Sequence, residues 1–260
     1  MVETRYVKSE ALSSEVLLKA ILPDKNEVKN IMILLHGNMN PEKAVELWNV
    51  LPSELNLEEL CNRYQMAVVI PLMENRYYIS TKEYDCESLV AQELPDYIKR
   101  SYGISESAEV ILAGISMGGF GATLISARTG VFRKVISISG AYIARDVEMG
   151  NPEVWGSLNP YSLNIRKSFL YYFLPLSDLS QSTERNALAA LKLFHERSEN
   201  PKFVVICGTD EWFYSRNIEL IRKMKESGMD YWFYPVDHGR HDADCFKKGL
   251  WKAMEYMYYK

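Results

Sequence analysis

Six short apolar runs, rich in β-branched or aromatic side chains, are spaced along the chain from residue 30 onward. Each run is only five or six residues long, which is typical of strands that are buried on both faces of a parallel sheet. The six runs are Asn30–Leu35, Met66–Ile70, Glu109–Ala113, Lys134–Ile138, Phe203–Cys207 and Tyr231–Pro235. A seventh run, Val16–Leu22, precedes them, and we expect it to form an antiparallel edge strand.

Between these runs, apolar residues recur at the spacing of an amphipathic helix. The predicted helices are Leu57–Tyr64, Glu87–Arg100, Gly119–Thr129, Ser215–Ser227 and Ala243–Tyr258. Strands that alternate with helices predict an α/β fold, with a mostly parallel, doubly wound sheet and helices on both of its faces. Residues 141–200 are too many for one crossover, so we expect an insertion that shapes the mouth of a site within a single domain of residues 1–260.

Composition narrows the classes of function. The chain has 260 residues, of which 47% are hydrophobic and 25% charged, as in a soluble globular protein. Its net charge of -4 and the lack of a basic cluster argue against nucleic acid and anionic membranes as partners. The first residues have neither a basic nor an apolar leader pattern, so we expect a cytoplasmic protein. The four scattered cysteines lack metal-ligand spacing and are interpreted as buried thiols.

The segment around Ser116 carries the strongest chemical signal. Glycines stand two residues before and two residues after it, at Gly114 and Gly118, in the pattern G-x-S-x-G. A predicted strand leads into this segment and a predicted helix leads out, as a nucleophile elbow requires. In such an elbow the serine has a strained backbone, and a side chain at either glycine would collide with a neighbouring element. We therefore predict that Ser116 is a nucleophile.

A nucleophilic serine of this kind needs donors for the oxyanion that forms on its substrate. The backbone N–H of Met117, at the start of the helix, is one expected donor. The second is expected from the turn that follows an earlier strand, where Gly37 permits an unusual backbone, and the Asn38 N–H is our prediction. The neighbouring His36 ends a strand ahead of the nucleophile, and we interpret it as a structural support of this turn.

The general base is expected on a late loop, because in this arrangement the histidine follows the acid along the chain. His195 lies in a polar run, so His238 and His241 remain, both between the last strand and the terminal helix. We favour His241, which is nearer to that helix.

The acid is expected after the preceding strand, where Asp210 and Glu211 are adjacent. It would hold the histidine tautomer and stabilise the imidazolium that forms when the serine loses its proton. Either carboxylate could do so chemically, so this argument leaves both open.

Taken together, these segments resemble those of the esterase D / tributyrin esterase family of α/β-hydrolases. This family includes acetyl esterases, feruloyl esterases and S-formylglutathione hydrolases. The resemblance runs in the same order along most of the chain. The matching stretches are LLHG at 34–37, Glu93-Leu94-Pro95 followed by Tyr97-Ile98, GISMGGFGA at 114–122, SISGAY at 137–142, CGTDEWFY at 207–214 with Asn217, and HGRHD at 238–242.

The resemblance implies the α/β-hydrolase fold, with Ser116 as nucleophile, His241 as base, and the N–H groups of Asn38 and Met117 as oxyanion donors. Two departures from the family pattern stand out. The family carries aspartate three residues after the glycine of the acid loop, and this chain has Glu211 in that slot, preceded by Asp210. The register favours Glu211 and the residue type favours Asp210; we predict Glu211. The second departure is a missing cysteine in the loop after 37, which disfavours a formylglutathione substrate.

The expected function is therefore hydrolysis of short-chain, acetyl-type carboxylic esters, with no metal and no organic cofactor. A small-molecule ester is the expected partner, and an acylated sugar is one candidate. Feruloyl or aryl esters and acyl transfer remain alternatives on the same residues, and a non-catalytic binding module is the least favoured one. Some aromatic residues could line a pocket, although core positions are the commoner role of such residues; they are Trp155, Tyr171, Tyr172, Phe173 and Trp212. The sequence does not determine whether copies of the chain associate.

Overall fold

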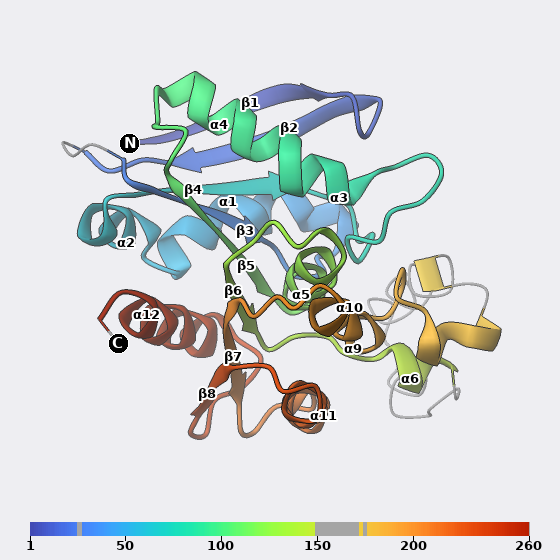
Figure 1. Ribbon diagram of the computed structural model, residues 1–260. Coiled ribbons are helices and arrows are strands. Elements are labelled where there is room, and N and C mark those ends of the chain that lie inside the picture. The colour runs from blue at the N-terminus through green and yellow to red at the C-terminus, as the bar shows by residue number, and fades with distance from the viewer. Residues whose placement is uncertain (25–27, 149–171, 174–175, 260) are drawn as a thin grey trace.

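The protein is built around one eight-stranded sheet (Figure 1), seen in a computed structural model that describes residues 1–24, 28–148, 172–173 and 176–259. The strand order is β1-β2-β4-β3-β5-β6-β7-β8, and the six strands from β3 to β8 run parallel. The strands are β1 (Val2–Ser9), β2 (Ser14–Ile21), β3 (Asn30–Leu35), β4 (Met66–Leu72), β5 (Glu109–Ile115), β6 (Lys134–Ile138), β7 (Lys202–Gly208) and β8 (Tyr231–Val236).

All six parallel strands coincide with the predicted runs to within two residues at either end, which confirms the α/β prediction. β2 is antiparallel to β4, as expected for the run that precedes the wound part. The prediction that this strand forms the edge was wrong, because β1 pairs with it on the outside in an antiparallel hairpin. Most side chains of β1 are exposed or half-buried, so its sequence lacks the continuous apolar run that marked the other strands.

Helices cover both faces of the sheet (Figure 1). One face carries α1 (Ala44–Glu54), α2 (Leu57–Tyr64) and α12 (Ala243–Tyr259). The other carries α3 (Cys86–Ser88), the π-helical turn η2 (Leu89–Glu93), α4 (Leu94–Tyr102), α5 (Met117–Thr129), α9 (Ala187–Ala190), α10 (Lys192–Glu196) and α11 (Tyr214–Glu226). The five predicted helices are all present, whereas α1 was not predicted; it follows the short 3-10 turn η1 (Pro41–Lys43) and contains a proline, Pro52.

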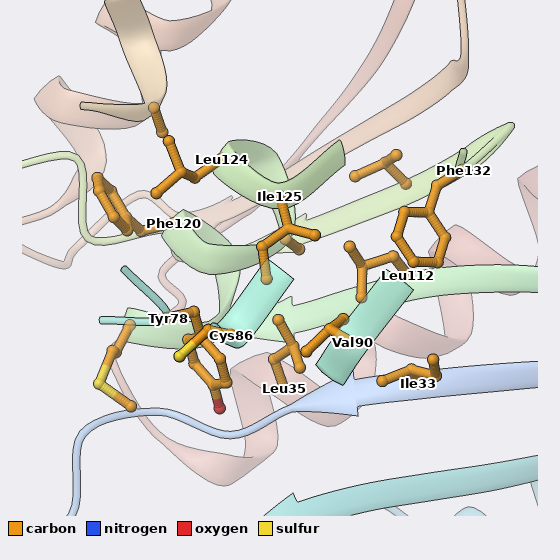
Figure 2. Close-up of a cluster of buried hydrophobic side chains, with 14 of the residues drawn as sticks. Ile33, Leu35, Tyr78, Cys86, Val90, Leu112, Phe120, Leu124, Ile125 and Phe132 are labelled. Atoms are coloured by element: carbon orange, nitrogen blue, oxygen red, sulfur yellow. The ribbon is translucent and has the colours of Figure 1, made fainter. Parts of the chain in front are cut away.

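The core is divided between the two faces by the alternation of side chains along each strand. In β3, Ile33 and Leu35 point to the face of α5, while Met32 and Leu34 point to the face of α12. Figure 2 shows the first of these layers, in which strand side chains meet Phe120, Leu124 and Ile125 of α5. Burial on both faces explains why these strands read as continuous apolar runs.

The chain between β6 and β7 contains the expected insertion, of which the described parts are short helices: α6 (Ala144–Glu148), η3 (Leu176–Gln181), α9 and α10. Residues 149–171 and 174–175 lie outside the described residues, so the proposed mouth of the site stays a prediction. None of the helices in the described ranges is long and apolar enough to cross a bilayer.

Candidate active site

The predicted nucleophile lies on a sharp turn at the carboxyl end of β5, at the sheet edge where the loops after β3, β7 and β8 also emerge. Ser116 has φ 56° and ψ -115°, a backbone conformation that costs energy for any residue with a side chain. The flanking glycines make the turn sterically feasible. A Cβ atom on Gly114 would lie 2.0 Å from the carbonyl oxygen of Gly118, and one on Gly118 would lie 2.0 Å from the carbonyl oxygen of Leu35. Both collisions are with backbone, so glycine is required at both positions.

His241 connects this serine to a carboxylate. Its Nε2 lies 3.1 Å from Oγ of Ser116, and its Nδ1 lies 2.7 Å from Oε2 of Glu211. The side chain of Glu211 is fully buried and that of His241 is 30% exposed. A buried carboxylate that accepts from Nδ1 favours the tautomer in which Nε2 is free to accept the serine proton. The arrangement can therefore carry a proton away from the hydroxyl.

Of the two adjacent carboxylates, only Glu211 reaches this histidine. Asp210 turns outward, where Oδ2 lies 3.3 Å from Nδ1 of His238, and both side chains are largely exposed. The backbone N–H of Asp210 donates to the carbonyl of Gly239, which ties the two loops together. Neighbouring residues on a tight turn point in different directions, so the glycine register was a better guide to the contact than residue type.

Two aromatic rings hold the imidazole of His241 in place. The ring of Phe213, just before α11, lies 5.0 Å from it between centroids, and that of Phe246, in α12, also lies 5.0 Å away in an edge-on arrangement. These contacts limit the rotation of the histidine ring and shield one part of it from water. Sequence reasoning assigned no role to either residue, because an aromatic residue in or beside a helix is usually interpreted as core.

On the other side of Ser116, the turn after β3 is held by His36. The Met73 N–H donates to Nε2 of His36 over 2.9 Å, so Nδ1 carries the proton and donates to the Gly37 carbonyl over 2.6 Å. Burial lowers the pKa of His36 to about 4, which keeps the ring neutral. The expectation that His36 supports the turn structurally agrees with these contacts.

The hydrogen bond from His36 to the Gly37 carbonyl also orients the predicted donor, the Asn38 N–H. In a trans peptide the C=O and the N–H point in opposite directions, so fixing the Gly37 carbonyl also fixes the direction of the Asn38 N–H. A Cβ atom on Gly37 would lie 3.2 Å from Cβ of Ser116, which places this peptide directly beside the nucleophile. Met117 is the first residue of α5, where an N–H has no acceptor within the helix.

Two further residues that the sequence did not reveal hold the same turn. Asn75 donates from Nδ2 to the carbonyl of Met39 over 2.7 Å and accepts from the Met39 N–H over 3.0 Å. The Tyr78 hydroxyl donates to the carbonyl of His36. The signal that could have found them is topological: β4 lies beside β3 and runs parallel to it, so the segments after both strands meet at one edge.

The aromatic candidates fall into different environments. Phe173 is fully buried and packs against Tyr77 and Phe120, so it belongs to the core. Tyr172 is half-buried, whereas Trp212 is 48% exposed and packs against Phe213 in a tilted arrangement, with ring centroids 3.8 Å apart. Trp155 and Tyr171 lie outside the described residues. All four cysteines are buried and free of disulfides.

A comparison with models of protein families shows which family this chain belongs to. The model of the Esterase family matches residues 9–257. The chain belongs to the Esterase family. It is 30% identical over 211 residues to an acetyl esterase of Caldicellulosiruptor saccharolyticus, an alignment that spans 76% of this chain and 74% of that protein.

Solved structures of similar shape confirm the α/β-hydrolase fold of this esterase. A fluorophosphonate-binding serine hydrolase of Staphylococcus aureus has a TM-score of 0.77 and 19% identity, over 99% of this chain and 98% of that one. An S-formylglutathione hydrolase of the same organism has a TM-score of 0.76 and 20% identity, with the same coverage of both chains. The family match and the acetyl esterase relative confirm the resemblance to the esterase D family and make this protein a carboxylic-ester hydrolase.

Proposed function

We propose that this esterase hydrolyses short-chain, acetyl-type esters through a triad of Ser116, His241 and Glu211 and a covalent acyl-enzyme. The observation that carries the proposal is the continuous pair of hydrogen bonds from the serine hydroxyl through both ring nitrogens to a buried carboxylate. Each group sits at the distance that proton transfer requires.

The reaction proceeds in two balanced halves. Oγ of Ser116 attacks the ester carbonyl while Nε2 of His241 takes the hydroxyl proton, and the ring then gives that proton to the departing alcohol. Water next attacks the acyl-enzyme and loses a proton to the same ring nitrogen, which passes that proton to Oγ of Ser116 as the acid leaves. Throughout, Glu211 stays ionised and stabilises the imidazolium.

The backbone N–H groups of Asn38 and Met117 are the proposed donors to the oxyanion of both tetrahedral intermediates. Donors of this kind act most strongly when they are fixed before the reaction. The neutral His36 and the two bonds of Asn75 to Met39 supply that rigidity on the Asn38 side. On the other side, Met117 is held by the helix that it begins.

The acetyl-type substrate rests on the similarity to an acetyl esterase. The exposed ring of Trp212 adds a surface on which a sugar or an aromatic ring of the alcohol could stack. Because an aromatic ring also fits such a surface, feruloyl or aryl esters are the second candidate. The guanidinium of Arg216 pairs with Asp146 of α6 and lies 5.7 Å from the Trp212 ring. We propose that the insertion, which includes α6, shapes the mouth of the site here.

Labelling with a fluorophosphonate and assaying p-nitrophenyl acetate tests the nucleophile. The wild type should be labelled once and should turn over the ester. Ser116→Ala should not be labelled and should keep only the ~10³–10⁴-fold acceleration over water that the rest of a site supplies. A matched control is Ser126→Ala, which removes another buried serine hydroxyl, within α5. Near-normal turnover by a folded Ser116→Ala would overturn the proposal.

The substrate class is tested with p-nitrophenyl esters of increasing chain length, acetylated xylose and methyl ferulate. The proposal expects kcat/KM to be highest for the two-carbon and three-carbon acyl groups and expects release of acetate from the sugar. A higher kcat/KM for methyl ferulate would favour the second candidate. Addition of an alcohol acceptor separates hydrolysis from acyl transfer, because only a transferase would divert most of the acyl group to it.

A further inference from the structure

The carboxylate of Glu211 has a second hydrogen-bond partner that the proposed triad does not use. One oxygen, Oε2, lies at His241, and the other, Oε1, accepts from the thiol of Cys207. Cys207 is the penultimate residue of β7, and the turn through Gly208 brings Glu211 back over the end of the same strand. The thiol and the carboxylate are both buried.

A buried carboxylate needs partners for both of its oxygens, because leaving one without a donor carries a desolvation penalty. The last torsion of a glutamate side chain is broad, so the chain alone does not fix which way the carboxylate plane faces. A donor on Oε1 and a ring N–H on Oε2 together define that plane.

The thiol of Cys207 is suited to donate a hydrogen bond and not to lose its proton. Burial raises the pKa of the Cys207 thiol far above its ordinary value, and the charge of Glu211 raises it further. The sulfur therefore keeps its proton near neutral pH. This excludes a role as a second nucleophile, since only the thiolate is reactive.

The surroundings keep the thiol and the carboxylate together. A Cβ atom on Gly208 would lie 2.3 Å from the carbonyl oxygen of Gly239 and 3.1 Å from Sγ of Cys245, so the turn is packed tightly on two sides. Cys207 of β7 and His241 of the last loop are hydrogen-bonded to Glu211, whose charge also acts on Cys245 of α12. Asp242 and Lys248 place opposite charges near Cys245.

We propose that Cys207 is a positioning residue of this esterase, whose S–H holds Oε1 of Glu211 so that Oε2 faces Nδ1 of His241. The inference rests on the triad role proposed for Glu211 and deepens it. An S–H group is a weak donor, so it orients the carboxylate while leaving most of the negative charge available to the imidazolium.

The test compares variants that remove the donor with one that retains it. Cys207→Ala and Cys207→Val both lack the S–H, and valine also fills the space of the thiol. Cys207→Ser replaces it with a hydroxyl donor. Cys245→Ala is the matched control, because it removes the neighbouring buried thiol without touching the carboxylate. For each variant, kcat and KM for p-nitrophenyl acetate, the pH profile of kcat/KM and the melting temperature are measured.

We expect kcat to fall roughly 10-fold in the alanine and valine variants with KM unchanged, as for the loss of one hydrogen bond to a charged group. Without the thiol, Oε2 no longer faces Nδ1 and supports the imidazolium less, so the acid limb of the pH profile should move to lower pH. Cys207→Ser should return both quantities toward the wild type. Cys245→Ala should keep the wild-type kcat and acid limb.

The proposal is overturned if the alanine and valine variants keep the wild-type kcat and acid limb, or if the serine variant behaves as they do. A drop in melting temperature alone would indicate packing only and would also overturn it. Glu211→Gln distinguishes failure of the role of Cys207 from failure of the triad. If Glu211→Gln is inactive while Cys207→Ala is normal, only the role of Cys207 fails. If Glu211→Gln is fully active, the proposed triad fails.

Discussion

The two sides of Ser116 are built from different kinds of groups. On the side of β3, the turn at 36–39 is held by a neutral histidine, an amide side chain and a tyrosine hydroxyl, all bonded to main-chain atoms. On the side of β7 and β8, the contacts are between side chains that carry or exchange protons, Glu211 and His241. His36 is completely buried, whereas His241 keeps 30% of its side chain exposed.

This difference follows from what each side has to do in the proposed reaction. Oxyanion donors work best as fixed dipoles that do not reorganise, and uncharged contacts to the backbone provide this without titrating near neutral pH. A general base must gain and lose a proton in every turnover, so its ring needs an ionised partner and access to the substrate. Two histidines of one site thus have opposite environments: burial suppresses protonation of one, and a carboxylate supports protonation of the other.

The largest effect is expected from a change of His241, on the side of β7 and β8. His241→Ala should lower kcat by ~10⁶-fold, about as much as loss of the serine, because nucleophile and base act as one unit. His238→Ala is the matched control, since that side chain is exposed and pairs only with Asp210 and Asp237 in the described structure. Initial rates with p-nitrophenyl acetate measure both. The reverse order of severity would show that the last loop has been assigned wrongly.

The next effect concerns the acid. Glu211→Gln should lower kcat by up to ~10⁴-fold, because an amide can hold the histidine in the wrong tautomer. Asp210→Asn should stay within a few-fold of the wild type, as its carboxylate faces solvent and His238. Steady-state kinetics of the two isosteric variants make the comparison. Equal losses in both would mean that local charge matters more than the hydrogen bond to Nδ1.

The smallest effect is expected on stability, and it tests the role of His36 on the β3 side of Ser116. The pKa of His36 is about 4 in the folded protein and near 6.5 in an unfolded chain, so only the unfolded state binds the proton between these values. Stability from this group is complete above pH 6.5 and is lost as the pH falls toward 4. The wild type should therefore lose roughly 3 kcal/mol more unfolding free energy between pH 7 and pH 4 than His36→Asn does.

Urea unfolding at several pH values measures this difference. The exposed His195, in α10, offers the control variant His195→Asn, which should keep the pH dependence of the wild type. If His36→Asn and the wild type lose stability in parallel, the ring is not held neutral in the folded state.

Much of the fold could be predicted because burial on both faces gives the parallel strands an unmistakable pattern. The edge strand β1 was not predicted, because partly exposed strands tolerate polar residues such as Glu3, Thr4 and Lys8. In the site, glycine spacing predicted where Ser116 lies and the register predicted the contact of Glu211. Asn75 and Cys207 could not be found in this way, because each role depends on where one side chain points: Asn75 reaches the segment after a neighbouring strand, and Cys207 reaches the turn after its own strand.

The backbone of Ser116 has a consequence for how this enzyme can be engineered. With φ 56° and ψ -115°, the residue occupies a region that glycine enters freely and that costs other residues roughly 1–3 kcal/mol. The enzyme thus gives up stability at the position that we propose as its nucleophile. Directed evolution for heat resistance alone is expected to enrich glycine at position 116 and to yield a more thermostable but inactive protein. A thermostability screen therefore has to be coupled to an activity screen.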